Sequence, residues 1–273
     1  MIVTRFAPSP TGLLHLGHAF AAFAAADTGE RFLLRIEDID ITRVREEFVE
    51  AIFEDLAWLG LRWEEPVLRQ SSRFDAYRAA LSRLDAKGLL YPCFCTRKEI
   101  AEEIARASTA PHGPEGPLYP GTCRHLSKDE QKARIESGAS YALRLDSQKA
   151  AAAVEALTFV EHGETIAVEP LLFGDVVLAR KETPFSYHLA VVVDDAFQDV
   201  TLVTRGIDLL PATHVQRVLQ ALLGLPEPAY AHHRLILDAQ GRKFSKRDKA
   251  VTLRDLRAAG ETPASLRARL TGM

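Results

Sequence analysis

The sequence predicts an α/β fold in which a parallel β-sheet is interrupted by a separate module. Three observations support this prediction. Strand-like and helix-like segments alternate from the N-terminus to about residue 90, as they do in parallel sheets. The next stretch carries all three cysteines and a segment rich in Gly, Pro and Ala, and the alternation returns beyond about residue 186. Because ligands of such sheets bind at the carboxyl ends of the strands, functional residues are expected there.

The alternation begins with a strand over Ile2–Phe6. The loop Ala7–Gly12 ends it, because two prolines and a glycine interrupt regular structure. The elements that follow are predicted from helix-forming residues, from alternation, and from apolar residues at helical spacing. They are a helix over Leu13–Ala26, a strand over Arg31–Ile36, and helices over Glu46–Leu59 and Ser72–Leu84.

The interrupting stretch is less regular. Residues Ala107–Gly121 show no periodicity, which predicts a loop or a mobile insertion. Short strand-like pieces follow at Tyr141–Leu145, Leu157–Val160 and Asp175–Arg180. The α/β pattern then returns at Tyr187–Val193 and Val200–Arg205, with a helix around Thr213–Leu223.

Composition excludes several classes of protein. A chain of 273 residues with 47% hydrophobic and 26% charged residues has the composition of a folded globular protein. No apolar run approaches the roughly 18 residues of a membrane span, and no segment fits a secretory signal well. We therefore expect a cytoplasmic protein without membrane contact, and we expect a monomer.

Charge is unevenly distributed along the chain. The net charge of −3 argues against a protein that binds nucleic acid over its whole surface. Residues 242–273, however, contain nine lysines and arginines against three acids. Such an end suits contact with RNA or phosphate, but it equally suits a solvated helix face, so both interpretations stay open.

The first candidate site is His15-Leu16-Gly17-His18, directly after the proline-rich loop. At the start of a helix the two histidines lie one turn apart on the same face. Gly17 has no side chain, so a flat base could approach the backbone there. A helix N-terminus favours phosphate, and imidazoles can donate hydrogen bonds to phosphate oxygens as charge develops. Alone, such a pair is more often structural, and metal binding lacks a third ligand nearby.

The second candidate site is Lys243-Phe244-Ser245-Lys246-Arg247, preceded by Gly241. A loop opened by glycine and carrying lysines can wrap a triphosphate, with Lys246 stabilising charge on a departing pyrophosphate. Basic pentapeptides are also common on solvated surfaces. The chain has neither G-x-x-x-x-G-K-[ST] nor G-x-G-x-x-G, so neither the usual P-loop nor a dinucleotide fingerprint applies.

Together and in this order, the two motifs resemble the HIGH and KMSKS signatures of class I aminoacyl-tRNA synthetases. The segments Arg5–Gly12 and Arg35–Asp38 resemble the glutamyl branch, and the resemblance extends from Arg5 to about Arg247. The resemblance implies the following division of the chain. It comprises a Rossmann-type catalytic domain (1–90 and 186–240), a zinc-containing α+β insertion that binds the acceptor (91–185), and a KMSKS-like loop with a short basic tail (241–273).

The resemblance also implies roles for individual residues. The residues that bind ATP, with Mg²⁺ on its phosphates, would be His15, Gly17, His18 and Lys246, and the catalytic residues would be His15, His18, Lys243 and Lys246. The residues that bind glutamate would be Arg5, Ala7, Ser9, Glu37, Tyr187 and Arg205. Of these, Arg5 and Arg205 would face the substrate carboxylates as bidentate forks. Glu37 would hold the α-ammonium, and Tyr187 would form a hydrogen bond to the substrate.

Within this branch the chain resembles the glutamyl-queuosine tRNA(Asp) synthetase family. Only about 26 residues follow Arg247, too few for a separate anticodon-binding domain, and Arg35–Asp40 and Val191–Asp195 fit that family. Its members are ligases that activate L-glutamate with ATP without needing tRNA, and transfer it to queuosine at the wobble position of tRNA(Asp). Two alternatives stay open: a truncated glutamyl-tRNA synthetase that charges a tRNA 3′ end, and a non-catalytic protein that binds glutamate or ATP.

The cysteines form a third candidate site. The spacing C-x-C of Cys93 and Cys95 suits metal ligands better than a disulfide in a cytosolic protein. The queuosine branch holds zinc with a pattern C-x-C followed by Y-x-x-x-C, which Cys93, Cys95, Tyr119 and Cys123 match. One structural zinc per chain is therefore implied. His125 is a rival fourth ligand, because C-x-H also suits zinc, and three unliganded buried cysteines are the alternative to a metal site.

Overall fold

The parallel sheet that the sequence predicts is confirmed by the computed structural model, which describes residues 1–106, 112–180, 184–236 and 251–272. The strand β1 (Val3–Phe6) pairs in parallel with β2 (Arg31–Ile36), and β2 pairs with β3 (Glu64–Arg69). The strand β11 (Leu202–Gly206) pairs in parallel with β12 (Ala229–His233). The N–H of Thr201 donates to the carbonyl of Val3 at 3.1 Å, so β11 lies beside β1.

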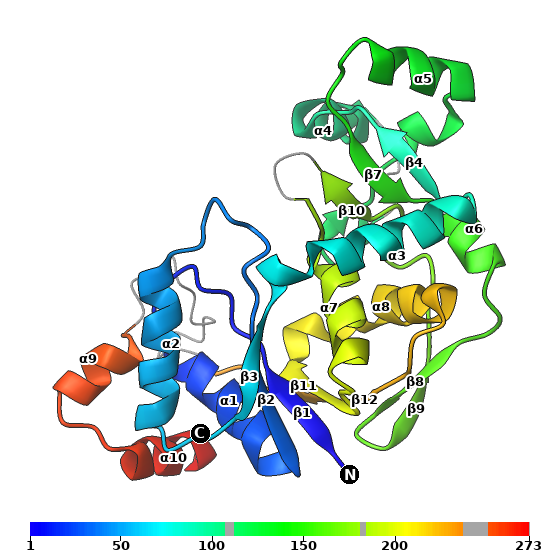
Figure 1. The fold of residues 1–273 in the computed structure, drawn as a ribbon. Helices are drawn as coiled ribbons and strands as arrows, with labels where there is room; N and C mark the ends of the chain where they lie inside the picture. The colour runs from blue at the N-terminus through cyan, green and yellow to red at the C-terminus, as the bar shows by residue number, and fades with distance from the viewer. Residues whose placement is uncertain (107–111, 181–183, 237–250, 273) are drawn as a thin grey trace.

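Helices cover both faces of these strands (Figure 1). They are α1 (Leu16–Thr28), α2 (Glu46–Trp58), α3 (Phe74–Ala86), α7 (Tyr187–Phe197) and α8 (Leu210–Leu223). One hydrophobic core joins α1 and α2 to β1 and β2, and a second joins α3, α7 and α8. The apolar stretch at 187–193 belongs to helix α7, which is buried along most of its length; a short apolar run does not distinguish a buried helix from a buried strand.

The interrupting module forms a separate antiparallel sheet. Its strands are β4 (Leu90–Cys93), β7 (Ala142–Leu145) and β10 (Val177–Arg180), with β7 in the centre. The helices α4 (Arg97–Arg106), α5 (Lys128–Glu136) and α6 (Ser147–Ala152) accompany them (Figure 1). The stretch predicted as a loop contains a short hairpin, β5 (His112–Gly113) with β6 (Gly116–Pro117).

A second hairpin shows that part of this region serves the parallel sheet. The strand β8 (Thr158–Glu161) pairs in parallel with β12 and in antiparallel fashion with β9 (Glu164–Ala167). The expected insertion, 91–185, therefore contributes a strand to the sheet of residues 186–240. Backbone pairing between segments far apart in sequence leaves no local signal, so sequence patterns could not reveal it.

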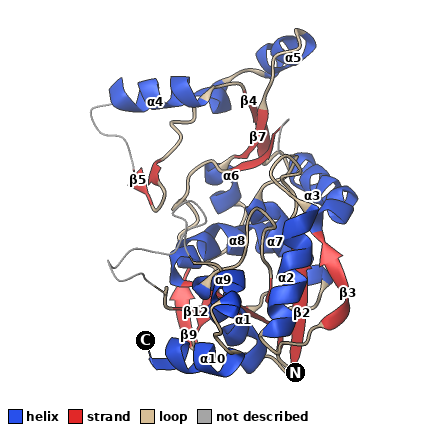
Figure 2. Ribbon diagram, turned by 90° about the vertical axis from the view of Figure 1, so that its left-hand side faces the viewer, coloured by secondary structure: helices blue, strands red, loops and turns tan. Residues whose placement is uncertain are grey.

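The C-terminal helices α9 (Leu253–Ala258) and α10 (Pro263–Gly272) lie against α1 and α2 (Figure 2). Leu253, Leu266 and Leu270 are buried in the same core as those helices. Their packing makes the end of the chain part of the folded body. Among the described residues, no helix combines the length and apolar character that crossing a membrane requires.

Candidate active site at the carboxyl ends of the strands

A cavity of about 410 Å³ opens where β1, β2 and β11 end. Since these strands run in parallel, their carboxyl ends meet at one edge of the sheet. The cavity gathers all six residues expected to bind glutamate, together with one of the two motif histidines. These residues are Arg5, Ala7, Ser9, His18, Glu37, Tyr187 and Arg205. Segments up to 200 residues apart in the sequence thus contribute to one hollow.

Arg5 is held by an acid behind the cavity. Its Nε donates to Oδ1 of Asp195 at 3.0 Å, and its Nη1 donates to the carbonyl of Thr204 at 3.2 Å. Asp195 also accepts from Nη1 of the fully buried Arg35 at 2.8 Å. Burial opposes ionisation of Asp195, but the two guanidinium groups outweigh it and lower the pKa of this carboxyl. One carboxylate therefore sits between two cations.

Glu37 follows β2 and supplies the carboxylate that lines the cavity. Its Oε1 lies 3.6 Å from Nη2 of Arg35, and its side chain is 11% exposed. Burial raises the pKa of Glu37, and Arg35 and Arg5 offset only part of that effect. A largely buried carboxylate with a raised pKa gains from a cationic ligand, because the ligand's charge favours the ionised form.

Arg205 lines the same cavity but has a different set of partners. Its Nη1 donates to the Tyr187 hydroxyl at 3.2 Å and to Oε1 of Gln216 at 2.8 Å. Its Nη2 donates to Oγ1 of Thr213 at 2.7 Å, and its Nε donates to Nε2 of His232 at 3.0 Å. Each of these partners is neutral. Within the part of the chain that the structure describes, no carboxylate forms an ion pair with Arg205.

The two motif histidines form the N-terminus of α1. Nδ1 of His15 accepts the N–H of Gly17 at 3.2 Å, and Nδ1 of His18 accepts the N–H of His15 at 3.2 Å. In the neutral rings the proton therefore resides on Nε2. A Cβ on Gly17 would lie 3.2 Å from Cε1 of His15, so this glycine makes room for the histidine ring. That is a structural reason for Gly17 that the sequence did not suggest.

The second motif lies outside the described residues, and so do the predicted roles of Lys243 and Lys246. The segment that follows it is described. Thr252 forms a β-bridge with His15, and the N–H of Leu253 donates to the carbonyl of Leu14 at 2.8 Å. The chain therefore returns to the first motif directly after the second one.

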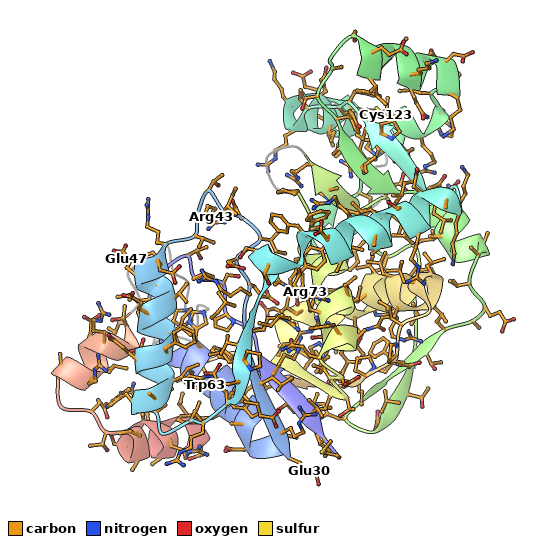
Figure 3. The ribbon with its side chains drawn as sticks, viewed as in Figure 1. Glu30, Arg43, Glu47, Trp63, Arg73 and Cys123 are labelled. Carbon is orange, nitrogen blue, oxygen red and sulfur yellow. The ribbon has the colours of Figure 1, made fainter. Side chains whose placement is uncertain are left out.

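The three cysteines converge in the separate module. Their sulfur atoms all lie within 4.8 Å of one another. Sγ of Cys95 is 3.4 Å from both Sγ of Cys123 and the hydroxyl of Tyr119, whereas His125 is exposed and outside the cluster. Burial raises the pKa of the Cys95 thiol to about 12, which a cation would reverse. Three thiols and a phenol in this arrangement fit a metal ion. Figure 3 shows Cys123 at the far end of the molecule from Glu30, which precedes β2.

The arginines of the C-terminal helices face acids of the protein itself. Arg254 and Arg257 lie 3.5 and 3.8 Å from Glu54 on α2, and Arg267 lies 2.6 Å from Asp27 on α1. Arg269 pairs with Glu261 at 2.9 Å. The described part of the basic tail therefore favours the interpretation as a paired helix face over an RNA contact. The other five basic residues lie outside the described residues.

Sequence patterns missed the residues that hold the two cavity arginines. Asp195 was noticed only as part of a resemblance, and His232 and Glu161 carried no signal beyond lying near the ends of apolar stretches. Thr213 and Gln216 sit on the predicted helix around 213–223, where polar residues are unremarkable. Only the fold brings these side chains to Arg5 and Arg205.

The whole chain, residues 1–273, matches the family described as class I tRNA synthetases (E and Q), catalytic domain. It is 48% identical over 281 aligned residues to the glutamyl-Q tRNA(Asp) synthetase of Rhodobacter capsulatus, covering 100% of both chains. It is also 48% identical to the protein of the same name from Nocardia farcinica, covering 98% of this chain and 83% of that one.

A solved structure shares the fold of this chain. The glutamate–tRNA synthetase of Elizabethkingia anophelis aligns with a TM-score of 0.73 and 29% identity, covering 90% of this chain. This chain spans 53% of that longer protein. The fold is thus that of a class I tRNA synthetase (E and Q) catalytic domain. Within that class, the chain belongs to the glutamyl-Q tRNA(Asp) synthetase family.

Proposed function

We propose that this protein activates L-glutamate with ATP, without needing tRNA, and transfers the glutamyl group to queuosine at the wobble position of tRNA(Asp). The family membership supports the reaction. The choice of glutamate as the amino acid rests on the cavity itself. One side of its lining is the guanidinium of Arg205, whose partners are neutral, and another is the largely buried carboxylate of Glu37. That pairing suits a substrate with both an anionic and a cationic end.

In this proposal the substrate's charges match the cavity's charges. Arg205 and the hydroxyl of Tyr187 bind one carboxylate, and Arg5 contributes a second cation from the neighbouring strand β1. Because Tyr187 accepts from Arg205, its own O–H is left to donate to the substrate. Glu37 binds the α-ammonium, and Ala7 and Ser9 shape the wall between them.

For the first step we propose attack by a glutamate α-carboxylate oxygen on the α-phosphorus of ATP. The new C(=O)–O–P linkage is the mixed anhydride of glutamyl-adenylate, and the bond from the α-phosphorus to pyrophosphate breaks, so pyrophosphate leaves. The residues that stabilise the phosphates are His15, His18, Lys243 and Lys246, and Mg²⁺ accompanies ATP. Gly17 leaves room for the ring of His15. In the second step a queuosine hydroxyl attacks the activated carbonyl, and AMP leaves. The protein supplies positioning and charge and forms no covalent intermediate.

We also propose the division into a Rossmann-type domain (1–90 and 186–240), an acceptor-binding insertion (91–185) and a terminal segment (241–273), with strand β8 of the insertion pairing into the sheet of the first domain. In the insertion, Cys93, Cys95, Tyr119 and Cys123 would hold one structural zinc ion. The convergence of these four side chains supports that set over one containing His125. Metal analysis tests it: Tyr119→Phe should weaken zinc retention against a chelator, and His125→Ala should not. The reverse result would assign the fourth ligand to His125.

The activity is tested with labelled glutamate, ATP and two tRNA pools, one containing queuosine and one lacking it. Label confined to the first pool is expected. Label on the 3′ ends of both pools would instead establish a truncated glutamyl-tRNA synthetase. Label on neither pool, with no glutamate-dependent exchange of pyrophosphate into ATP, would leave only a binding protein. Lys246→Ala should abolish that exchange, and unchanged exchange would remove the role given to Lys246.

A further inference from the structure

Two buried side chains form a second layer behind Arg205, outside the lining of the cavity. His232, near the end of β12, accepts the Nε–H of Arg205 at 3.0 Å. Nδ1 of His232 lies 2.6 Å from Oε2 of Glu161, at the end of β8. His232 is 5% exposed and Glu161 is 8% exposed. The three residues thus form a continuous row that runs from the cavity to the β8–β9 hairpin.

The hydrogen bonds in this row fix its protonation. Arg205 can only donate, so Nε2 of His232 carries no proton, and Nδ1 must donate to Glu161. The other oxygen of Glu161 accepts the backbone N–H of His232 at 2.8 Å, which locks the carboxylate in place. Burial lowers the pKa of His232 to about 4, and Arg205 acts in the same direction, so the ring is neutral near pH 7.

The arrangement solves an electrostatic problem. A buried guanidinium needs a counter-charge, yet a carboxylate directly against Arg205 would compete with the substrate. Glu161 stands one imidazole ring away, so it compensates the cation without occupying the fork. Gln216 and Thr213 hold the two terminal nitrogens, and His232 holds the third, so the guanidinium plane cannot turn.

We infer that His232 and Glu161 are positioning residues that orient Arg205 toward a substrate carboxylate and so set the preference for glutamate over glutamine. This inference rests on the proposed function. A guanidinium held in one orientation binds a charged acceptor with two oxygens, such as a carboxylate, more strongly than it binds a neutral acceptor. A glutamine amide lacks the charge and turns an N–H₂ toward donors. If Arg205 is released, glutamate loses more binding than glutamine, and discrimination falls.

The test is glutamate-dependent exchange of labelled pyrophosphate into ATP, in the full chain and without RNA. His232→Phe keeps the ring volume and removes the acceptor. It should raise the KM for glutamate about 10- to 100-fold, because a hydrogen bond to a charged group is lost. The KM for ATP should not change, and the ratio of kcat/KM for glutamate to that for glutamine should fall. His232→Gln, whose amide oxygen can accept from Arg205, should restore much of the affinity.

The matched control is His214→Phe. His214 is also buried, on α8, but it accepts the backbone N–H of Glu169 and packs on Phe159. Its replacement should leave the KM for glutamate unchanged. If His232→Phe behaves like His214→Phe, or raises both KM values equally, the inference is wrong.

Glu161→Gln provides a second route if the phenylalanine variant does not fold, since it changes only one oxygen to nitrogen. It should raise the KM for glutamate in the same direction by about tenfold or less. A wild-type KM in that variant would remove Glu161 from the row. If the wild-type protein shows no glutamate-dependent exchange, the proposed function fails, and this inference fails with it.

Discussion

Arg5 and Arg205 line the same cavity, but the protein holds them in opposite ways. Arg5 forms an ion pair with buried Asp195, which also binds Arg35. Arg205 is fixed by neutral groups, and the carboxylate of Glu161 lies behind the imidazole of His232. In a sequence the two arginines are equivalent. Their partners indicate that Arg5, besides facing the cavity, stabilises the fold through its ion pair, whereas Arg205 has no directly bound carboxylate and keeps its charge for a ligand.

The comparison has a physical basis in the cost of burying charge. A buried ion pair is broken at high cost when one member is removed, because the other member stays buried alone. A buried cation without a directly bound anion lowers the stability of the fold, and an anionic ligand that binds the cation offsets this cost. Sites of this kind often lose little stability when the charged residue is removed, and lose function instead.

The largest effect is expected at Arg5. Arg5→Met leaves Asp195 with only Arg35 as its cationic partner, so the free energy of unfolding should fall by about 3 kcal/mol. Urea denaturation at pH 7 measures this. Because the pKa of Asp195 is lowered in the folded protein, its ion pairs stabilise the fold above the unfolded pKa of about 3.9. Their contribution is lost as pH falls through the folded pKa, so variant and wild type should converge in acid.

At Arg205 the balance should reverse. Arg205→Met should raise the KM for glutamate about 100-fold, since a charge-assisted pair of hydrogen bonds is lost. The free energy of unfolding should fall less than in Arg5→Met. Removal of Arg205 takes away a buried charge and its hydrogen bonds, but it leaves no directly bound carboxylate without its partner. Pyrophosphate exchange and urea denaturation on the same samples measure both quantities. Equal losses of stability in the two variants would erase the distinction between the arginines.

A smaller and pH-dependent effect is expected at Glu37, the carboxylate that lines the same cavity. Burial raises its pKa, so it becomes neutral at a higher pH than an ordinary glutamate. As pH falls through that pKa, the α-ammonium loses its partner and the KM for glutamate should rise. In Glu37→Gln the KM should be high at every pH, without this acidic rise. The KM for ATP over the same range is the control, and an identical acidic rise in both proteins would assign it to another group.

The contrast between the arginines also explains what the sequence could and could not predict. The parallel sheet and the glycine and histidines at the start of α1 follow from local patterns, and local patterns predicted them. The partners of the cavity residues do not. Asp195 lies 190 residues from Arg5, and Glu161 lies 71 residues from His232. No periodicity links positions so far apart, and burial of a polar side chain becomes visible only once the chain is folded.

The basic tail illustrates the same limit, because a count of charges does not say what they face. Arg267 is 44% exposed, pairs with Asp27 and stacks on the ring of Phe23 at 4.1 Å. An arginine engaged in this way is a third type, held by an acid but in contact with solvent.

The smallest effect is therefore expected for Arg267→Gln. Loss of an exposed ion pair should lower the free energy of unfolding by about 1 kcal/mol or less. If Arg267 serves the packing of α10 on α1, the KM for the RNA acceptor should stay at the wild-type value at low and at moderate salt. A rise that is larger at low salt, where phosphate contacts are strongest, would show that this end of the chain contacts RNA after all. That result would place Arg267 with Arg205, as a cation kept for a ligand, rather than with Arg5.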